Sequence, residues 1–187
     1  LEKIVFAAHI DGIRNFAYLS CCQYFWVIKM NINNDKKKYR FLEDVAIADI
    51  AYEAYGKDLN ELFENAALAI FELSANLKTV DAKEKIEFEL ENEKLDNLLY
   101  DFLSEILFLK DSNYMVFKKV KVSIKENKKY NLRAVLEGDT INPQKQQLEN
   151  DIKAVTMHMF ELKKEKNGYK ATVVVDIWTK DLNKIDI

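Results

Sequence analysis

The sequence predicts an α+β domain in which a mostly antiparallel sheet has two main helices packed on one side. Two segments show the 3.6-residue spacing of amphipathic helices, five others alternate apolar and polar residues as half-buried strands do, and a sixth strand is expected to lead into the first helix. The predicted order is strand, helix, strand, helix and then strands joined by hairpins, which is typical of antiparallel sheets with helices on one face. The chain of 187 residues is long enough to bury one core.

The first predicted helix runs from Asp58 to Ser74, with Asp58 and Glu61 spaced as in a capping box. The second covers 95–109. Each has one apolar stripe and a polar remainder, so one face of each helix is expected to be buried. The stripe positions are Leu59, Leu62, Phe63, Ala66, Ile70 and Leu73 in the first helix, and Leu95, Leu98, Leu99, Phe102, Ile106 and Leu109 in the second.

The predicted strands have alternating patterns, such as Ile86, Phe88 and Leu90 between three glutamates. Asn167-Gly168 is a preferred pair for a two-residue hairpin turn and is expected to join the last two strands. The six strands are predicted at 49–55, 86–91, 114–125, 130–138, 152–165 and 169–177.

Composition excludes several classes of function. The net charge is −3 and the sequence pI about 5.6, so no global basic field favours non-specific phosphate binding. The only cysteines are Cys21 and Cys22, which argues against a disulfide framework or a thiolate metal site and fits a cytoplasmic protein. The uncharged run 15–28 is shorter than the roughly 20 residues of a membrane-spanning helix, so no membrane association is expected.

Residues 1–36 are interpreted as an N-terminal extension outside the domain. The first methionine is Met30, and a polar stretch follows it. We expect Met30 to be the natural start and residues 1–29 to be translated upstream sequence. If the segment is native, the alternatives are an extra helix or strand packed on the domain, or a disordered extension.

Two aspartates in apolar strand contexts, Asp49 and Asp176, are the main chemical signal. Aspartate is depleted in strands, and two carboxylates brought together repel unless a cation lies between them or one is protonated. Carboxylate and carbonyl oxygens suit hard cations such as calcium or magnesium. The alternative is that both residues cap turns or face water.

Standard signatures of catalysis are absent: there is no glycine-rich phosphate loop and no nucleophile elbow. His158, in the middle of a predicted strand, is expected to be a hydrogen-bonded structural residue. A metal-dependent hydrolase with His158 as base is the remaining enzymatic alternative. A dense set of lysines is interpreted as a solvated strand face rather than a phosphate-binding patch: Lys118, Lys119, Lys121, Lys125, Lys128 and Lys129.

Several separated blocks resemble the archease family, in the right order and over almost all of residues 37–177, which we treat as the archease-like domain. Residues 178–187 form a C-terminal extension beyond the usual end of family chains. The blocks are Tyr39-Arg40-Phe41-Leu42-Glu43, Ala48-Asp49-Ile50, the stretch 53–67, the stretch 98–109, Lys153-Ala154-Val155-Thr156-Met157-His158 and Val174-Val175-Asp176-Ile177.

The resemblance implies a non-enzymatic accessory protein that assists the tRNA-splicing ligase RtcB in guanylylation and repeated turnover. It also implies that Asp49, Asp176 and the main-chain oxygen of Ile177 bind a metal, usually assigned as calcium, and that Lys153 is functionally important. Asp44, in a loop two residues longer than the family pattern, is a candidate auxiliary ligand. RNA contact would then be indirect, through the ligase, and a chaperone-like role toward a tRNA methyltransferase is the family's alternative.

Strand geometry gives a separate expectation for Lys153. If Asn167-Gly168 closes a regular two-residue hairpin, Asp176 lies opposite Met159. Lys153 would then be about 20 Å from the metal, at about 3.3 Å per residue. Without a bulge or another pairing, Lys153 is therefore expected to contact the partner and not the cation.

Overall fold

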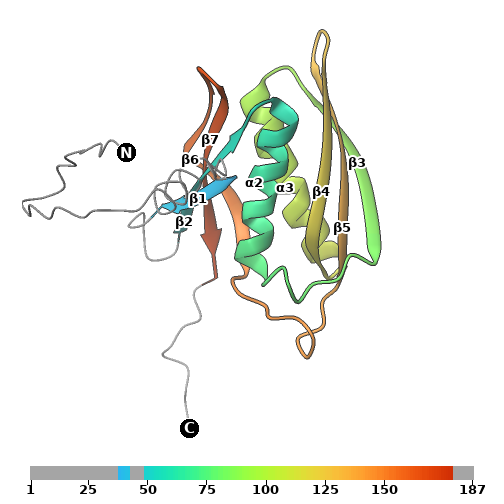
Figure 1. The fold of residues 1–187 in the computed structure, drawn as a ribbon. Coiled ribbons are helices and arrows are strands. Elements are labelled where there is room, and N and C mark those ends of the chain that lie inside the picture. The colour runs from blue at the N-terminus through green and yellow to red at the C-terminus, as the bar shows by residue number, and fades with distance from the viewer. Residues whose placement is uncertain (1–37, 43–48, 179–187) are drawn as a thin grey trace, which may run out of the picture. The chain divides into compact units, whose positions relative to one another are not determined.

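The computed structural model describes residues 38–42 and 49–178, in which two helices lie between two antiparallel sheets (Figure 1). The α+β class, the antiparallel pairing and the two main helices are confirmed, and each sheet has helices packed on one side. The strands form two sheets and not one. Their orders are β1-β2-β7-β6 and β3-β5-β4.

The elements follow the predicted order with small shifts at their ends. The helices are α2, Leu59–Ser74, and α3, Leu95–Ser112. The strands are β1 at Tyr39–Leu42, β2 at Asp49–Gly56, β3 at Glu84–Asn92, β4 at Met115–Glu126, β5 at Tyr130–Thr140, β6 at Ile152–Glu165 and β7 at Gly168–Ile177. None of the helices in the described residues is both long and apolar enough to cross a membrane.

Helix α2 begins where the capping pattern predicts. Asp58 precedes the helix in an extended conformation, and its Oδ1 accepts a hydrogen bond from the Glu61 amide at 2.9 Å. The Glu61 carboxylate reaches back to the amide of Lys57 at 2.7 Å. These two bonds satisfy amide groups that have no partner inside the helix.

The core lies between the sheets and is joined across layers by aromatic contacts. Phe63 of α2 and Phe102 of α3 have ring centroids 5.5 Å apart, and Phe102 also stacks on Phe88 of β3 at 6.0 Å. Phe71 of α2 meets Phe117 of β4 at 5.7 Å. Each helix thus buries its apolar stripe against both sheets.

Helix α2 also closes the free edge of β4. The Asn60 side-chain oxygen accepts a hydrogen bond from the Ile124 amide at 2.8 Å, and Glu64 accepts one from the Val122 amide at 3.0 Å. Asn60 and Glu64 are four residues apart, so they lie on the same face of the helix. Edge amides that would otherwise be open to another strand therefore have partners within the chain.

The β6–β7 hairpin corrects the predicted turn and register. Glu165 pairs with Gly168, so Gly168 is the first residue of β7, with φ 143°, and not part of the two-residue loop. The register then shifts twice along β6, between Thr156 and Glu161 and between Ile152 and Ala154. Asp176 consequently pairs with Ala154, and the predicted partner Met159 lies in the first irregularity with φ 53°.

Candidate metal centre

The predicted aspartate pair is formed. Asp49 begins β2 and Asp176 lies one residue from the end of β7, and their Cα atoms are direct partners in the antiparallel ladder. The residues beside them in sequence, Ile50, Val175 and Ile177, pack on the core. Side chains alternate along a strand, so both carboxylates point to the opposite face of the sheet. Directly opposed residues have Cβ atoms about 4.5–5.5 Å apart, where two negative charges repel.

Lys153 lies beside this pair, which overturns the expected separation of about 20 Å. Its Nζ is 3.4 Å from the Oδ1 of Asp176, and the Lys153 and Asp176 side chains are 29% and 35% exposed. The pairing of β6 is the physical reason. The changed turn and the irregularity between Thr156 and Glu161 bring Ala154 opposite Asp176, and the bulge between Ile152 and Ala154 then places Lys153 beside it. A regular strand pattern gives no sign of this bulge.

Trp178 completes the surroundings of the ammonium group. The Nζ of Lys153 is 4.3 Å from the centroid of the Trp178 ring, within the range of a cation–π contact. The Trp178 amide donates to the carbonyl oxygen of Asp151 at 2.9 Å, so just past the end of β7 the backbone remains fixed to the residue that precedes β6. Sequence reasoning did not identify Trp178, although an aromatic residue two positions after Asp176 was the available signal.

The segment that leads into Lys153 is held by the C-terminal ends of both helices. The Glu149 amide donates to the carbonyl of Ser74 at 3.0 Å, and Asn150 donates from its backbone and side chain to the carbonyl of Leu73. Asp151 forms an ion pair with Lys110 of α3, with 3.2 Å between Oδ1 and Nζ. Burial alone would lower the pKa of Lys110, but hydrogen bonds to Asp111 and Asp151 outweigh it and raise that pKa.

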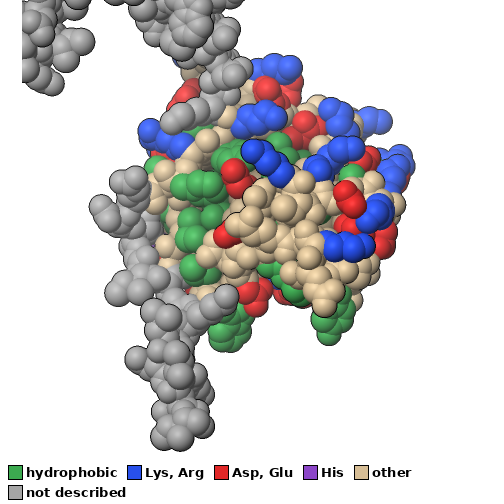
Figure 2. Space-filling view, turned by 60° about the horizontal axis from the view of Figure 1, so that its bottom comes forward, with side chains coloured by type: hydrophobic (Ala, Val, Ile, Leu, Met, Phe, Trp, Pro, Cys, Tyr) green, Lys and Arg blue, Asp and Glu red, His purple; other side chains and the backbone are tan. Residues whose placement is uncertain are grey.

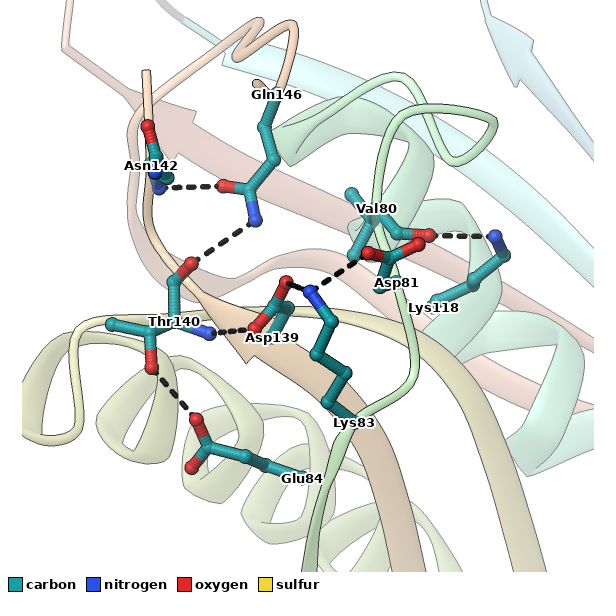
Figure 3. A network of polar contacts seen from close by, with 9 residues as sticks. All are labelled: Val80, Asp81, Lys83, Glu84, Lys118, Asp139, Thr140, Asn142 and Gln146. Atoms are coloured by element: carbon teal, nitrogen blue, oxygen red, sulfur yellow. Dashed lines mark hydrogen bonds and ion pairs between the residues drawn. The ribbon is translucent and has the colours of Figure 1, made fainter. Parts of the chain in front are cut away.

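A polar network fixes the other end of the same loop (Figure 3). The buried side chain of Gln146 accepts from the Asn142 amide at 2.8 Å and donates to the carbonyl of Thr140 at 3.0 Å. Lys83 bridges Asp81 and Asp139 at 2.8 and 2.9 Å. The loop between β5 and β6 is therefore anchored at several points before it delivers Lys153 to the aspartates.

The remaining predicted site residues are less informative. Ile177 directs its side chain into the core and follows Asp176, so its carbonyl oxygen belongs to the same strand end. Asp44 lies outside the described residues. His158, which was expected to be a hydrogen-bonded structural residue, is exposed in the irregular part of β6. It is five residues from Lys153 along the strand, which gives no support to a role as base beside the aspartates.

The oxygen atoms of Asp49 and Asp176 are ligands of the type that hard cations prefer. Two opposed carboxylates supply charged oxygen ligands, and their repulsion is relieved by a positive ion. Among residues 38–42 and 49–178, no group of three or more His, Cys, Asp or Glu side chains is arranged to hold a metal. The pair thus fits a calcium-like ion that takes further oxygens from the main chain and water, and does not fit a metal that needs a cage of nitrogen or sulfur ligands.

A second charged cluster lies on the same face of the sheet, farther along β2. Glu53 is 7% exposed. Its carboxylate accepts hydrogen bonds from Arg40 at 2.6 Å, from Lys170 at 2.5 Å and from the Tyr55 hydroxyl at 2.5 Å. Burial alone would raise the pKa of the Glu53 carboxyl, but these hydrogen bonds outweigh it and lower the pKa to about 2. Through these contacts of Glu53, the cluster connects β1, β2 and β7.

The lysines of β4 and its hairpin form the predicted solvated face. Lys119, Lys121 and Lys129 are exposed and pair with Glu137, Glu64 and Glu91. Lys118 differs because it is half-buried and its Nζ donates to the carbonyl of Val80 at 2.6 Å. On the face seen in Figure 2, basic and acidic side chains are likewise interspersed.

Comparisons with known proteins agree with this architecture. The model of the archease protein family matches residues 39–177. Archease of Methanosarcina acetivorans is 43% identical over 143 residues, which are 75% of this chain and 97% of the relative. Archease of Sulfurisphaera tokodaii is 38% identical, over 75% of this chain and 99% of the relative.

A solved structure shows the same fold. The solution structure of protein 1598 of Methanobacterium thermoautotrophicum has a TM-score of 0.67 and 38% identity, and the match covers 75% of this chain and 99% of that one. The family match includes β1 through β7 and contains both aspartates, Lys153 and Ile177. This chain belongs to the archease family.

Proposed function

We propose that this protein is a non-catalytic accessory factor of the tRNA-splicing ligase RtcB, and that it acts through a hard divalent cation, calcium in the first instance, held by Asp49 and Asp176. The observation that carries the proposal is the direct pairing of these two carboxylates across β2 and β7. Membership of the archease family supplies the partner, through the role that the family resemblance implies.

The surroundings of the pair support binding in preference to catalysis. A bound cation supplies positive charge that neutralises the two carboxylates and fixes the adjoining strand ends. In the described part of the chain, the contacts given at the pair are the Lys153 ammonium on Asp176 and the Trp178 ring against that ammonium. None of these forms a nucleophile with its base. The site is therefore suited to shape a surface for a partner protein.

The partner surface is proposed to include Lys153. Its ammonium is part-exposed at the end of an anchored loop, beside the cation ligands. Because the chain is acidic and several of its exposed lysines are paired with glutamates, we propose that RNA is contacted through the ligase and not directly. The reducing setting expected from the cysteine content suits a cytoplasmic protein.

The test is an RNA ligation assay with limiting RtcB and excess RNA, with and without calcium. The wild-type chain is expected to convert a single turnover into many, and Asp176→Asn is expected to remove that gain. Glu87→Gln, on the outer face of the other sheet, is the matched control and should stimulate like wild type. Equal ligation with and without the wild-type chain would refute the proposal. Stimulation of a tRNA methyltransferase instead would favour the family's alternative role.

A further inference from the structure

We infer that Trp178 is a positioning residue that holds the Lys153 ammonium on Asp176, so that Lys153 competes with the divalent cation for the aspartate pair. The inference rests on the proposed function, since the cation is part of that proposal. It concerns two residues of this chain whose contacts the structure gives directly.

The first step is that Lys153 acts as an internal counter-ion. Its Nζ lies 3.4 Å from Asp176 Oδ1, while Asp176 faces Asp49 across the ladder. One ammonium offsets part of the repulsion between the two carboxylates. A divalent ion on the same pair would replace that charge and would repel the ammonium.

The second step is that Trp178 keeps the ammonium in place. The ring lies 4.3 Å from Nζ, on a residue fixed through its amide to Asp151. Lys153 follows Asp151 by two residues, and the bulge directs it to this side of the sheet. Ring, carboxylate and bulge therefore define one position for a side chain that would otherwise move freely.

The third step is the consequence for binding. A unit charge about 6 Å from a divalent ion in a medium as polar as water weakens the binding of that ion by about tenfold, and by less at longer distances. Removing the ammonium with Lys153→Met should therefore tighten calcium binding by about three- to tenfold. Removing the ring with Trp178→Leu should tighten it by a smaller factor, about two- to threefold, because the ammonium remains but is held less firmly.

The cation should also change the environment of Trp178. When calcium takes Asp176, the ammonium leaves its position between the carboxylate and the ring. It can then meet an anionic group of the partner protein. This would make Lys153 available to the partner only when the cation is bound.

The experiment uses the full chain in a Trp26→Phe background, which leaves Trp178 as the only tryptophan. Calcium is titrated by calorimetry and, separately, by tryptophan emission. The expected results are tighter binding for Lys153→Met, and an emission change on binding that is present with Lys153 and absent without it.

The matched control is Lys164→Met. Lys164 lies on the same strand with its Nζ 5.8 Å from the Tyr169 ring, but away from the aspartates. The Lys164→Met substitution should leave calcium affinity unchanged. Two results would overturn the inference while the cation site stands. One is calcium binding by Lys153→Met that is equal to or weaker than that of wild type, and the other is the same emission change in Lys153→Met as in wild type. A wild-type chain that binds no calcium would overturn both the inference and the cation site.

Discussion

Replacing Glu53 by glutamine tests how strongly one buried carboxylate holds β1, β2 and β7 together. The wild-type side chain is 9% exposed and meets Arg40 at 2.6 Å and Lys170 at 2.5 Å. Glutamine keeps the shape but removes the negative charge, so two cations lose their counter-ion. The Arg40 and Lys170 side chains are 52% and 25% exposed, so water takes up part of the uncompensated charge and the loss is smaller than for a fully buried pair.

The pKa gives the magnitude and the sign of the pH dependence. The Glu53 pKa is lowered from 4.5 to about 2, and each pKa unit corresponds to about 1.4 kcal/mol. The carboxylate therefore contributes at most about 3 kcal/mol to the free energy of unfolding. A lowered folded-state pKa means that this stability is present above pH 4.5 and is lost as the pH falls towards 2.

Glu87 provides the control for this substitution. It also has two cationic partners, Arg133 at 2.8 Å and Lys85 at 2.6 Å, and these hydrogen bonds also lower its pKa to about 2. It lies on an exposed sheet face, where water screens the charges. Glu87→Gln should therefore cost much less stability than Glu53→Gln.

The assay is urea unfolding of wild type, Glu53→Gln and Glu87→Gln at several pH values. The difference between wild type and Glu53→Gln should be large at pH 7 and should shrink between pH 4.5 and 2. The comparison cancels the other carboxylates, which titrate in both proteins. A difference that is constant across this range, or an equal loss for Glu87→Gln, would refute the reasoning.

Three further substitutions test local features of the fold by chemical denaturation. Asp58→Ala removes the N-cap of α2 and should cost about 1 kcal/mol, and no loss would contradict the capping bond. Asn60→Ala leaves the Ile124 amide without its partner and should cost about 1–2 kcal/mol, with increased self-association as a second sign of an opened edge. Met159→Gly should stabilise by about 1 kcal/mol because φ is 53° there, whereas Met157→Gly should destabilise.

The local elements were predictable because their signals are local. The apolar stripe of α2 and its N-cap Asp58 lie within one continuous stretch of sequence, and the structure has both. Division into two sheets was not predictable in this way. Alternation shows that β3 or β7 has a buried face, but it does not say which strand lies beside it.

The site was predictable in part for a similar reason. Asp49 and Asp176 stand out because aspartate is unfavourable in apolar strands, and the ladder brings them opposite each other. The position of Lys153 was wrong because two irregularities in β6 change the register without a clear mark in the sequence. Trp178 was missed because its contact depends on that same register.

The binding of calcium by the aspartate pair is tested most directly by urea unfolding of wild type and Asp49→Asn, each with EDTA and with calcium at about 100 times its dissociation constant for wild type. Wild type is expected to gain about 2.7 kcal/mol from the ion. Asp49→Asn should gain little, and with EDTA it should be at least as stable as wild type because the opposed charges are gone. Equal gains from calcium in both proteins would contradict the account.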